Sequence, residues 1–322
     1  MGNGQRRQCA GRGRLHQRGS RVSASGSDGR RRHEPRVSVV VLTYNRCNWL
    51  RGTLRRLVEL PERVPIAVVD NGSSDGTADM VRAEFPEATL LRLPDNIGAA
   101  ARNVGVDWAR TPYVAFCDDD TWWHPGALTL AADMLDRHHD VASLTARLMV
   151  VREGREPETD GISHVMADSP IPSAGLPGKA ILGLLAGASV FRTQAYRSAG
   201  GYHPRLFIGG EETLLALDLS ALGWRLVYCP ELVAYHQPCP VRAHRLRRRL
   251  LARNAIWSAW LRLPASAALA ESLRTLPALM REGGLIGCLD TVRGLPWILR
   301  ERAVIPPTVQ ALRRYLGPPQ PR

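Results

Sequence analysis

The amino-acid sequence predicts an α/β fold built on a mixed, mainly parallel sheet flanked by helices. Two patterns predict it: short apolar runs alternate with amphipathic segments, and polar clusters follow the ends of these runs. The first run, Val37–Thr43, is rich in β-branched residues and almost continuously apolar, as a strand buried on both faces should be. Asn48–Leu60 then carries Leu50, Leu54 and Leu57 at helical spacing. This alternation is typical of parallel α/β sheets.

The later elements follow in the same order along the chain. Further strands are expected at Ile66–Asp70, Thr89–Leu93, Tyr113–Cys117 and Arg225–Val233. Further helices are expected at Asp75–Glu84, Gly98–Ala109 and Glu212–Leu222, and Ala180–Phe191 reads as either a strand or a buried helix. Residues 152–178 are rich in Pro, Gly and charge and predict a long loop, which in compact domains is often a lid or an acceptor-binding segment.

The distribution of charge divides the chain into three parts. The net charge is +13, of which residues 1–36 contribute +8 and residues 242–262 contribute +7, so the rest is close to neutral at −2. A nucleic-acid enzyme would more often spread basic residues over its folded body, so no nucleic-acid partner is expected. We predict a disordered Arg-rich tail at 1–36, a folded domain at 37–240 and a helical basic extension at 241–322.

The extension is expected to be interrupted by proline. Breaks are predicted at Pro264, Pro277, Pro296, Pro306 and Pro307. The six cysteines form no Cys-x-x-Cys pair, which argues against a zinc site and favours reduced thiols. No secretory signal and no apolar run of about 18 residues is present, so a cytoplasmic protein without a membrane span is expected.

Polar clusters follow three of the predicted strands. They are Thr43-Tyr44-Asn45, Asp70-Asn71 and Asp118-Asp119-Asp120. In parallel sheets ligands bind at the carboxyl ends of the strands, so these clusters predict a site at one edge of the sheet. Asp70 could accept a hydrogen bond from a base or ribose, although the segment after it also fits an ordinary turn with Ser74 or Asp75 capping a helix.

The acidic run is the strongest single feature. Three adjacent carboxylates repel one another unless a cation neutralises them. If the backbone stays extended, Asp118 and Asp120 point to one side, and two carboxylates beside phosphate oxygens are what Mg²⁺ or Mn²⁺ needs. The alternative is a solvated acidic turn. Trp122 and Trp123, which follow the run, could line a sugar site or pack in the core.

Taken together, four segments resemble a family 2 glycosyltransferase in order and spacing. They are Val39–Arg46, Val69–Thr77, Asn96–Asn103 and Phe116–Asp120, and the resemblance extends over about residues 37–240. It implies the A-type nucleotide-sugar-binding fold, a Rossmann-like fold known as GT-A. The residues that it implies for the donor are Thr43, Tyr44, Asn45 and Arg46 at the nucleotide, Asp70 and Asn71 at the base or ribose, Arg102 and Asn103 near the diphosphate, and Asp119 toward the fold or the sugar.

The resemblance also implies a metal and a general base. Asp118 and Asp120 match the Asp-x-Asp metal site, and His236 is either a further ligand or a structural histidine. Gly209-Gly210-Glu211-Glu212 resembles the family's Gly-Glu-Asp helix start, which makes Glu212 the expected base and leaves Glu211 as the alternative. Both acids would also favour a helix N-terminus without any catalytic role.

The reaction implied is inverting transfer of a sugar from a nucleoside diphosphate to an acceptor hydroxyl, assisted by Mn²⁺ or Mg²⁺. The acceptor class stays open among glycan, lipid-linked and small molecules. In residues 242–262, Leu246, Leu250, Trp257 and Leu261 lie at helical spacing opposite Arg245, Arg248 and Arg249. Such a helix could lie on an anionic membrane, at the inner face of the plasma membrane, or pack on the folded domain.

Two rival classes are less well supported. A nucleotidyltransferase would usually carry a Gly-rich phosphate loop with a lysine near the first strand, but the single lysine is Lys179. A non-catalytic scaffold with this fold would be expected to lack the acids, yet Asp118, Asp120 and Glu212 are all present.

Overall fold

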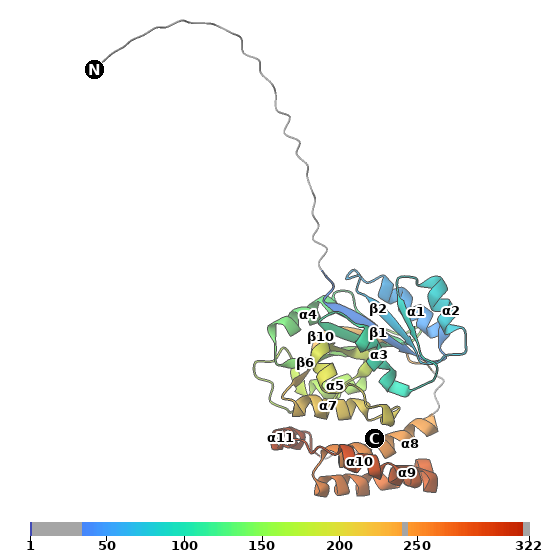
Figure 1. The fold of residues 1–322 in the computed structure, drawn as a ribbon, viewed down its shortest axis with the longest axis vertical. Coiled ribbons are helices and arrows are strands. Elements are labelled where there is room, and N and C mark those ends of the chain that lie inside the picture. Colours follow the sequence, from blue (N-terminus) through green and yellow to red (C-terminus); the bar gives the residue numbers. More distant parts are fainter. Residues whose placement is uncertain (2–33, 240–243, 318–322) are drawn as a thin grey trace. The chain divides into compact units, whose positions relative to one another are not determined.

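A computed structural model describes Met1, residues 34–239 and residues 244–317, and the chain from Pro35 onward forms one compact unit. Figure 1 shows a twisted sheet with helices on both faces, followed by a group of helices that ends the chain. The sheet has ten strands in the main order β3-β2-β1-β4-β9-β6-β10-β5. The predicted tail at 1–36 lies almost wholly outside the described residues.

The N-terminal half of the sheet is parallel, as predicted. β1 (Val37–Thr43) pairs in parallel with β2 (Ile66–Asp70) and with β4 (Tyr113–Asp118), and β2 pairs in parallel with β3 (Thr89–Arg92). β1 is buried along its length, which explains why its sequence is apolar on both faces.

The second half of the sheet is mixed. The long strands β6 (Val141–Val150) and β10 (Arg225–His236) pair in parallel. Shorter antiparallel strands complete the sheet: β5 (Thr121–Trp123), β7 (Glu158–Thr159), β8 (Lys179–Ile181) and β9 (Ser189–Arg192). The predicted mixed, mainly parallel sheet is therefore confirmed.

Two apolar layers cover the faces of the sheet. One layer packs Val39 and Val41 of β1 against α1 (Cys47–Val58), α2 (Thr77–Glu84) and α4 (Ala127–Arg137). The other packs Val40 against α3 (Ala101–Trp108), α6 (Thr193–Ser198) and α7 (Glu211–Ala221). The alternation along β1 assigns each residue to a layer, because successive side chains of a strand point to opposite faces.

Some elements differ from the sequence expectation. Residues 152–178 are not a continuous loop, because they contain β7 and α5 (Gly161–Ala167). Ala180–Phe191 is neither one strand nor one helix: part of β8, the 3₁₀ turn η2 (Ala186–Ala188) and part of β9 divide it. α4 and β6 were not predicted, although both are largely buried.

The C-terminal extension is helical, as expected, and packs on α7. It comprises α8 (His244–Arg262), α9 (Ala265–Arg293), α10 (Leu295–Glu301) and α11 (Pro307–Tyr315). Figure 1 shows α8 between α7 and α9, in agreement with their contacts. Four of the five prolines lie at helix starts, but Pro277 lies inside α9, where the departure from helical geometry falls instead at Gly284. No described helix is long and apolar enough to cross a membrane.

Candidate functional site

Three strand ends meet at one edge of the sheet. The register places Thr43 beside Asp70 and Leu42 beside Asp118, so the ends of β2, β1 and β4 lie next to one another. Thr43 Oγ1 donates a hydrogen bond to Asp119 Oδ2 at 3.2 Å. The structure therefore brings the three polar clusters together at the carboxyl edge, where α/β sheets bind ligands.

The acidic run does not stay extended. β4 ends at Asp118, and Asp119 and Asp120 form a turn before β5. The expectation that Asp118 and Asp120 share one side, with Asp119 opposite, is therefore wrong. Asp118 Oδ1 accepts a hydrogen bond from Arg102 Nη2, whereas Asp119 Oδ1 and Asp120 Oδ2 both accept from Arg46 Nη1 at 2.9 Å.

Burial changes the acidity of the middle carboxylate. Asp119 is only 7% exposed, and burial together with the charges of Asp120 and Asp118 raises its pKa to about 7 in spite of Arg46. Asp118, with 41% of its side chain exposed, is the most accessible acid of the run, since the side chains of Asp119 and Asp120 are 10% and 1% exposed. Asp118 is therefore the carboxylate best placed to meet a ligand from solvent.

His236 lies beside the acidic turn. Its Nε2 is 3.6 Å from Asp120 Oδ1, and the following residue, Gln237, donates a backbone hydrogen bond to Asp120 O at 2.9 Å. In the described part of the chain, no three His, Cys, Asp or Glu residues are already gathered at metal-binding spacing. A cation there would complete its coordination with phosphate oxygens and water, as Mg²⁺ commonly does.

The space above Asp118 favours such a ligand. A Cβ on Gly187 would lie 2.9 Å from Asp118 Oδ2, so the glycine leaves room beside that oxygen. Carboxylate oxygens suit Mg²⁺ or Mn²⁺. Asp118 and Asp120 supply such oxygens, but they pair with different arginines, and the described residues do not gather them with His236 into a ready-made metal site.

The nucleotide segments form a connected pair of loops. Asp70 is fully buried; its Oδ1 accepts a hydrogen bond from Ser73 N at 2.9 Å, and its Oδ2 lies 3.6 Å from Arg92 Nε. Asn45 has a φ of 51°, and its Oδ1 accepts from Ser74 N at 2.8 Å. These contacts join the end of β1 to the loop after β2. Tyr44, which the resemblance also implies at the nucleotide, is 44% exposed beside them.

Asn71 and Asn103, two residues predicted to bind the nucleotide-sugar donor, use their side-chain amides for hydrogen bonds within the protein. Asn71 Oδ1 accepts from Ile97 N, and its Nδ2 donates to Asn96 Oδ1 and to Gly98 O, so Asn71 holds the turn before α3. Asn103 does not join the acidic turn, because its amide bonds Tyr196 and Tyr202.

Arg102 is the buried cation of the site. It is 4% exposed and lies on α3 between Asp118 and the two glutamates of α7. A buried guanidinium keeps its charge, so Arg102 offsets the negative charge that Asp118, Glu211 and Glu212 gather here.

Glu212 is linked to Asp118 through the η2 turn. Glu212 Oε1 accepts a hydrogen bond from Ala186 N at 2.6 Å, and the next residue, Gly187, lies against Asp118. Burial and the neighbouring charge of Glu211 raise the pKa of Glu212 to about 7. Glu211 is 7% exposed, and burial raises its pKa as well. Glu212, joined to the acidic turn, is the better placed of the two acids.

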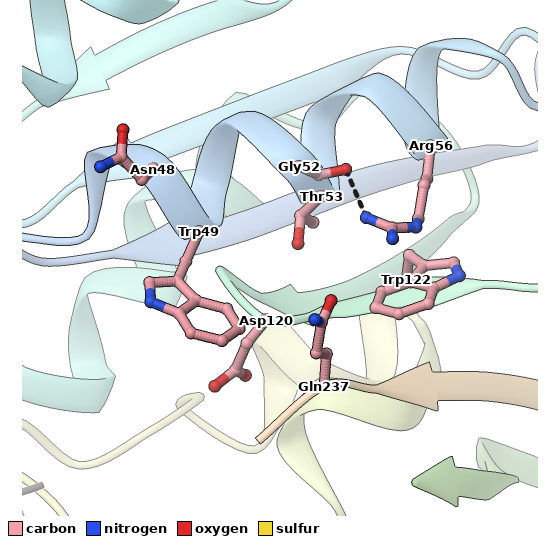
Figure 2. A pocket seen from close by; sticks show the side chains of 8 residues that line it. All are labelled: Asn48, Trp49, Gly52, Thr53, Arg56, Asp120, Trp122 and Gln237. Atoms are coloured by element: carbon pink, nitrogen blue, oxygen red, sulfur yellow. Dashed lines mark hydrogen bonds between the residues drawn. The ribbon is translucent and has the colours of Figure 1, made fainter. Parts of the chain in front are cut away.

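A pocket of about 250 Å³ lies between α1 and Asp120, the last residue of the acidic turn (Figure 2). Side chains of α1, including Trp49 and Arg56, face Asp120, Trp122 and Gln237 across it. The Arg56 guanidinium carbon lies 4.2 Å from the Trp122 ring centroid. Trp123 is 1% exposed and packs in the core. The two tryptophans therefore differ: Trp122 lines a pocket and Trp123 does not.

Asn254 is a residue that the sequence interpretation missed. It is fully buried on α8, and its Nδ2 lies 2.7, 3.2 and 2.5 Å from the carbonyl oxygens of Leu206, Ile208 and Gly209. The loop that precedes Glu211 is therefore held by a helix far along the chain. No local motif marks an asparagine for such a role.

Residues 38–173 match the family model described as glycosyl transferase family 2. A solved mannosyltransferase from Pyrobaculum calidifontis, in complex with GDP-Man and Mn²⁺, superposes with a TM-score of 0.54 at 21% identity, over 88% of this chain and 86% of that chain. At this identity the likeness concerns the fold alone, and the fold is the GT-A fold that the sequence resemblance implied.

Two curated relatives illustrate the range of similarity. The chain is 35% identical over 119 residues to validoxylamine A glucosyltransferase of Streptomyces hygroscopicus subsp. limoneus, covering 35% of this chain and 26% of the relative. It is 25% identical over 240 residues to N-acetylglucosaminyl-diphospho-decaprenol L-rhamnosyltransferase of Mycobacterium tuberculosis, covering 62% and 75%. The matches span only 21% to 26% of the first curated relatives' length.

Proposed function

We propose that the protein is an inverting glycosyltransferase that moves a sugar from a nucleoside-diphosphate sugar to an acceptor hydroxyl. The observation that carries the proposal is the link between Glu212 and Asp118 through Ala186 and Gly187. It sets a carboxyl group of raised pKa next to the edge where the nucleotide loops and the acidic turn meet. The match of residues 38–173 to the glycosyl transferase family 2 model supports the same reaction class.

The donor would lie along the ends of β1, β2 and β4. Asp70 and the loop joined by Asn45 are suited to the nucleoside, because Asp70 is buried at a strand end with a carboxylate that can accept from a base or ribose. Asp118, Asp120 and His236 would hold a divalent cation. When bound, such a cation neutralises the charge of the leaving diphosphate.

Glu212 would act as the general base. Its Oε1 is fixed by the Ala186 N–H, so the carboxylate is oriented before the acceptor arrives. It would remove the acceptor hydroxyl proton as the hydroxyl attacks the anomeric carbon. A single base on the acceptor side supports direct displacement, and therefore inversion.

The acceptor class follows from a weaker line of support. The mycobacterial relative is named for transfer to a diphospho-decaprenol-linked sugar, which favours a lipid-linked acceptor over a free glycan or small molecule. Peripheral binding at an anionic membrane belongs to the same proposal. Most of the apolar face of α8 is not free for such binding, because Leu250, Trp257 and Leu261 are buried in the protein and only Leu246 of the four predicted residues is exposed.

The test is a screen of nucleotide sugars by thermal shift, with and without Mn²⁺ or Mg²⁺. We expect one donor to raise the unfolding midpoint only when metal is present, since a ligand that binds the native state alone stabilises it. Asp118→Asn and Asp120→Asn should weaken that shift. Asp79→Asn, at a carboxylate that is 86% exposed on α2, is the matched control and should leave the shift unchanged. If no donor shifts the midpoint, the proposal fails.

A further inference from the structure

An apolar surface on the C-terminal helices is left uncovered in the described part of the chain. Side chains at helical spacing on α9 are exposed: Leu269, Leu273, Leu276 and Met280, followed after the bend by Leu285 and Leu289. Leu273 is 63% and Leu285 is 73% exposed. On α10, Leu295 and Leu299 extend the series. We call these residues the leucine face. Exposed apolar surface of this extent usually marks an interaction site.

The bend in α9 turns its second arm back toward its first. Gly284 has a φ of 54° and a ψ of −148°, which is not helical. A Cβ on Gly287 would lie 3.2 Å from Leu279 Cδ1, and Cys288 Sγ lies 3.2 Å from Met280 Sδ. Residues eight apart in one straight helix could not make these contacts. The chain therefore folds back at Gly284, and Met280 of the first arm meets the second arm.

The most exposed charged side chains beside the leucine face are arginines of α9. Arg281 and Arg293 are 73% and 76% exposed, and each directly follows an exposed apolar residue of α9. The acids of α9 are less accessible, and each is ion-paired. Glu282 is 11% exposed and pairs with both Arg281 and Arg248 of α8. Asp290 is 26% exposed beside both Arg293 and Arg249 of α8, and Glu271 is 17% exposed beside Arg274. Glu282 and Asp290 are each shared by two arginines, so guanidinium groups outnumber carboxylates along this rim of the face.

We propose that the leucine face docks on an anionic lipid surface. Leucines that enter the interface beside arginines that meet lipid phosphates are the chemistry of an interfacial helix pair. A second copy of the chain fits less well, because two such faces would bring their arginine rims together. The inference rests on the membrane part of the proposed function, and it moves the contact from α8 to α9 and α10.

The experiment is co-sedimentation of the full chain with vesicles, measured without donor or acceptor. Phosphatidylcholine vesicles with phosphatidylglycerol are compared with phosphatidylcholine alone. We expect binding to the anionic vesicles, and a loss of affinity of about tenfold or more in the Leu273→Ser, Leu289→Ser double variant, since each leucine removes its apolar area from water on docking. Arg281→Ser with Arg293→Ser should weaken binding mainly at low salt.

Val165→Ser provides the matched control, because Val165 is 72% exposed on α5, away from the leucine face, and its loss should not affect binding. The Arg-rich residues 1–36 could bind anionic vesicles by charge alone. Binding that the leucine variant does not change would therefore assign it to another segment and overturn the inference. A dimer of the native chain that the leucine variant dissociates would also overturn it. Transfer to a water-soluble acceptor is assayed in parallel, so failure of the surface and failure of the enzyme proposal give different results.

Discussion

Five charged side chains meet after β4, and their balance sets the chemistry of the edge. Three carboxylates, Asp118, Asp119 and Asp120, are matched by two guanidinium groups, those of Arg46 and Arg102. The arginines offset most of the repulsion that three adjacent acids create. Asp118 is matched by Arg102, whereas Asp119 and Asp120 share Arg46, so the unmatched carboxylate lies in the buried Asp119–Asp120 pair, where the pKa of Asp119 is raised to about 7.

At the residue scale, the raised pKa of Glu212 predicts the pH dependence of the reaction. The base must be ionised, so kcat/KM should rise with pH through about 7 and then level off. Glu212→Gln should remove transfer while the donor-dependent thermal shift persists. The measurement is a pH profile of released nucleoside diphosphate beside donor binding. Full activity in the Gln variant would assign the base to another residue, and Glu211→Gln tests that alternative.

The stability of the same variant provides an independent check. The folded pKa of Glu212 is about 7 and the ordinary value is 4.5, so between these values the folded state holds a proton that the unfolded state has lost. The free energy of unfolding therefore falls as pH rises through this window, by at most about 3 kcal/mol. Glu212→Gln lacks this group and should be more stable than the native chain at pH 8, but not at pH 4.

Residue types at the site could be predicted from the sequence, but their partners could not. Asp70 and Asp118 lie at the predicted edge, because each ends a strand that the apolar pattern locates, and Glu212 lies in the first turn of a helix that is located in the same way. The pairing of Asp119 and Asp120 with Arg46 depends on the point at which β4 ends. An extended and a turned acidic run share the same sequence pattern, and only the backbone distinguishes them.

At the scale of elements, η2 is a short turn with two functions. Its first backbone N–H holds Glu212, and its glycine leaves the space beside Asp118. Hydropathy alone predicts one apolar strand or helix for Ala180–Phe191, since Ala, Gly and Leu dominate this segment. The break comes from tertiary pairing, because β8 pairs with β10 while β9 pairs with β4 and β6. The local sequence does not determine with which strand each half of the segment pairs.

Gly187→Ala is the sharpest test of η2. The new methyl would meet Asp118 Oδ2 at 2.9 Å and Thr121 at 3.1 Å, so the Asp118 carboxylate must turn away. We expect metal-dependent donor binding to weaken by about tenfold or more, as a displaced ligand commonly does, with a nearly unchanged melting temperature. Gly183→Ala is the control in the same segment, where a Cβ meets only the end of Met166 at 4.0 Å. Equal donor binding in both variants would contradict the assigned role of Gly187.

At the scale of the whole molecule, the C-terminal helices contact the sheet-containing part of the chain through the loop before α7. Leu206 of that loop and Leu214 of α7 share an apolar cluster with Trp257 and Trp297. Phe207 has a φ of 62°, an unusual value for a residue with a side chain, and its carbonyl accepts from Ala99 N at 2.6 Å. Asn254 holds the neighbouring carbonyls. The loop is thus fixed from both the α3 side and the α8 side.

Asn254→Ala should disturb the base more than the donor site. It leaves buried carbonyl groups without their donor, at a cost of about 1 to 3 kcal/mol of stability. As a positioning residue, Asn254 should lower kcat with little change in donor KM when replaced, and the pH midpoint of the rate should move. Ser258→Ala, one turn further along the same buried face of α8, is the matched control. If both variants lose only stability, the role of Asn254 is structural.

The hydrogen bonds from Asn254 to three carbonyls couple substitutions in α8 to substitutions in the loop before α7. A substitution in α8 alters the shape of the loop that carries the glutamate pair, and a substitution in that loop alters the fit of α8. Effects at residues in contact do not add. Substitutions in α8 and in the Gly-Gly loop are therefore expected to be non-additive in stability, and a transfer of the C-terminal helices to a related protein should include that loop.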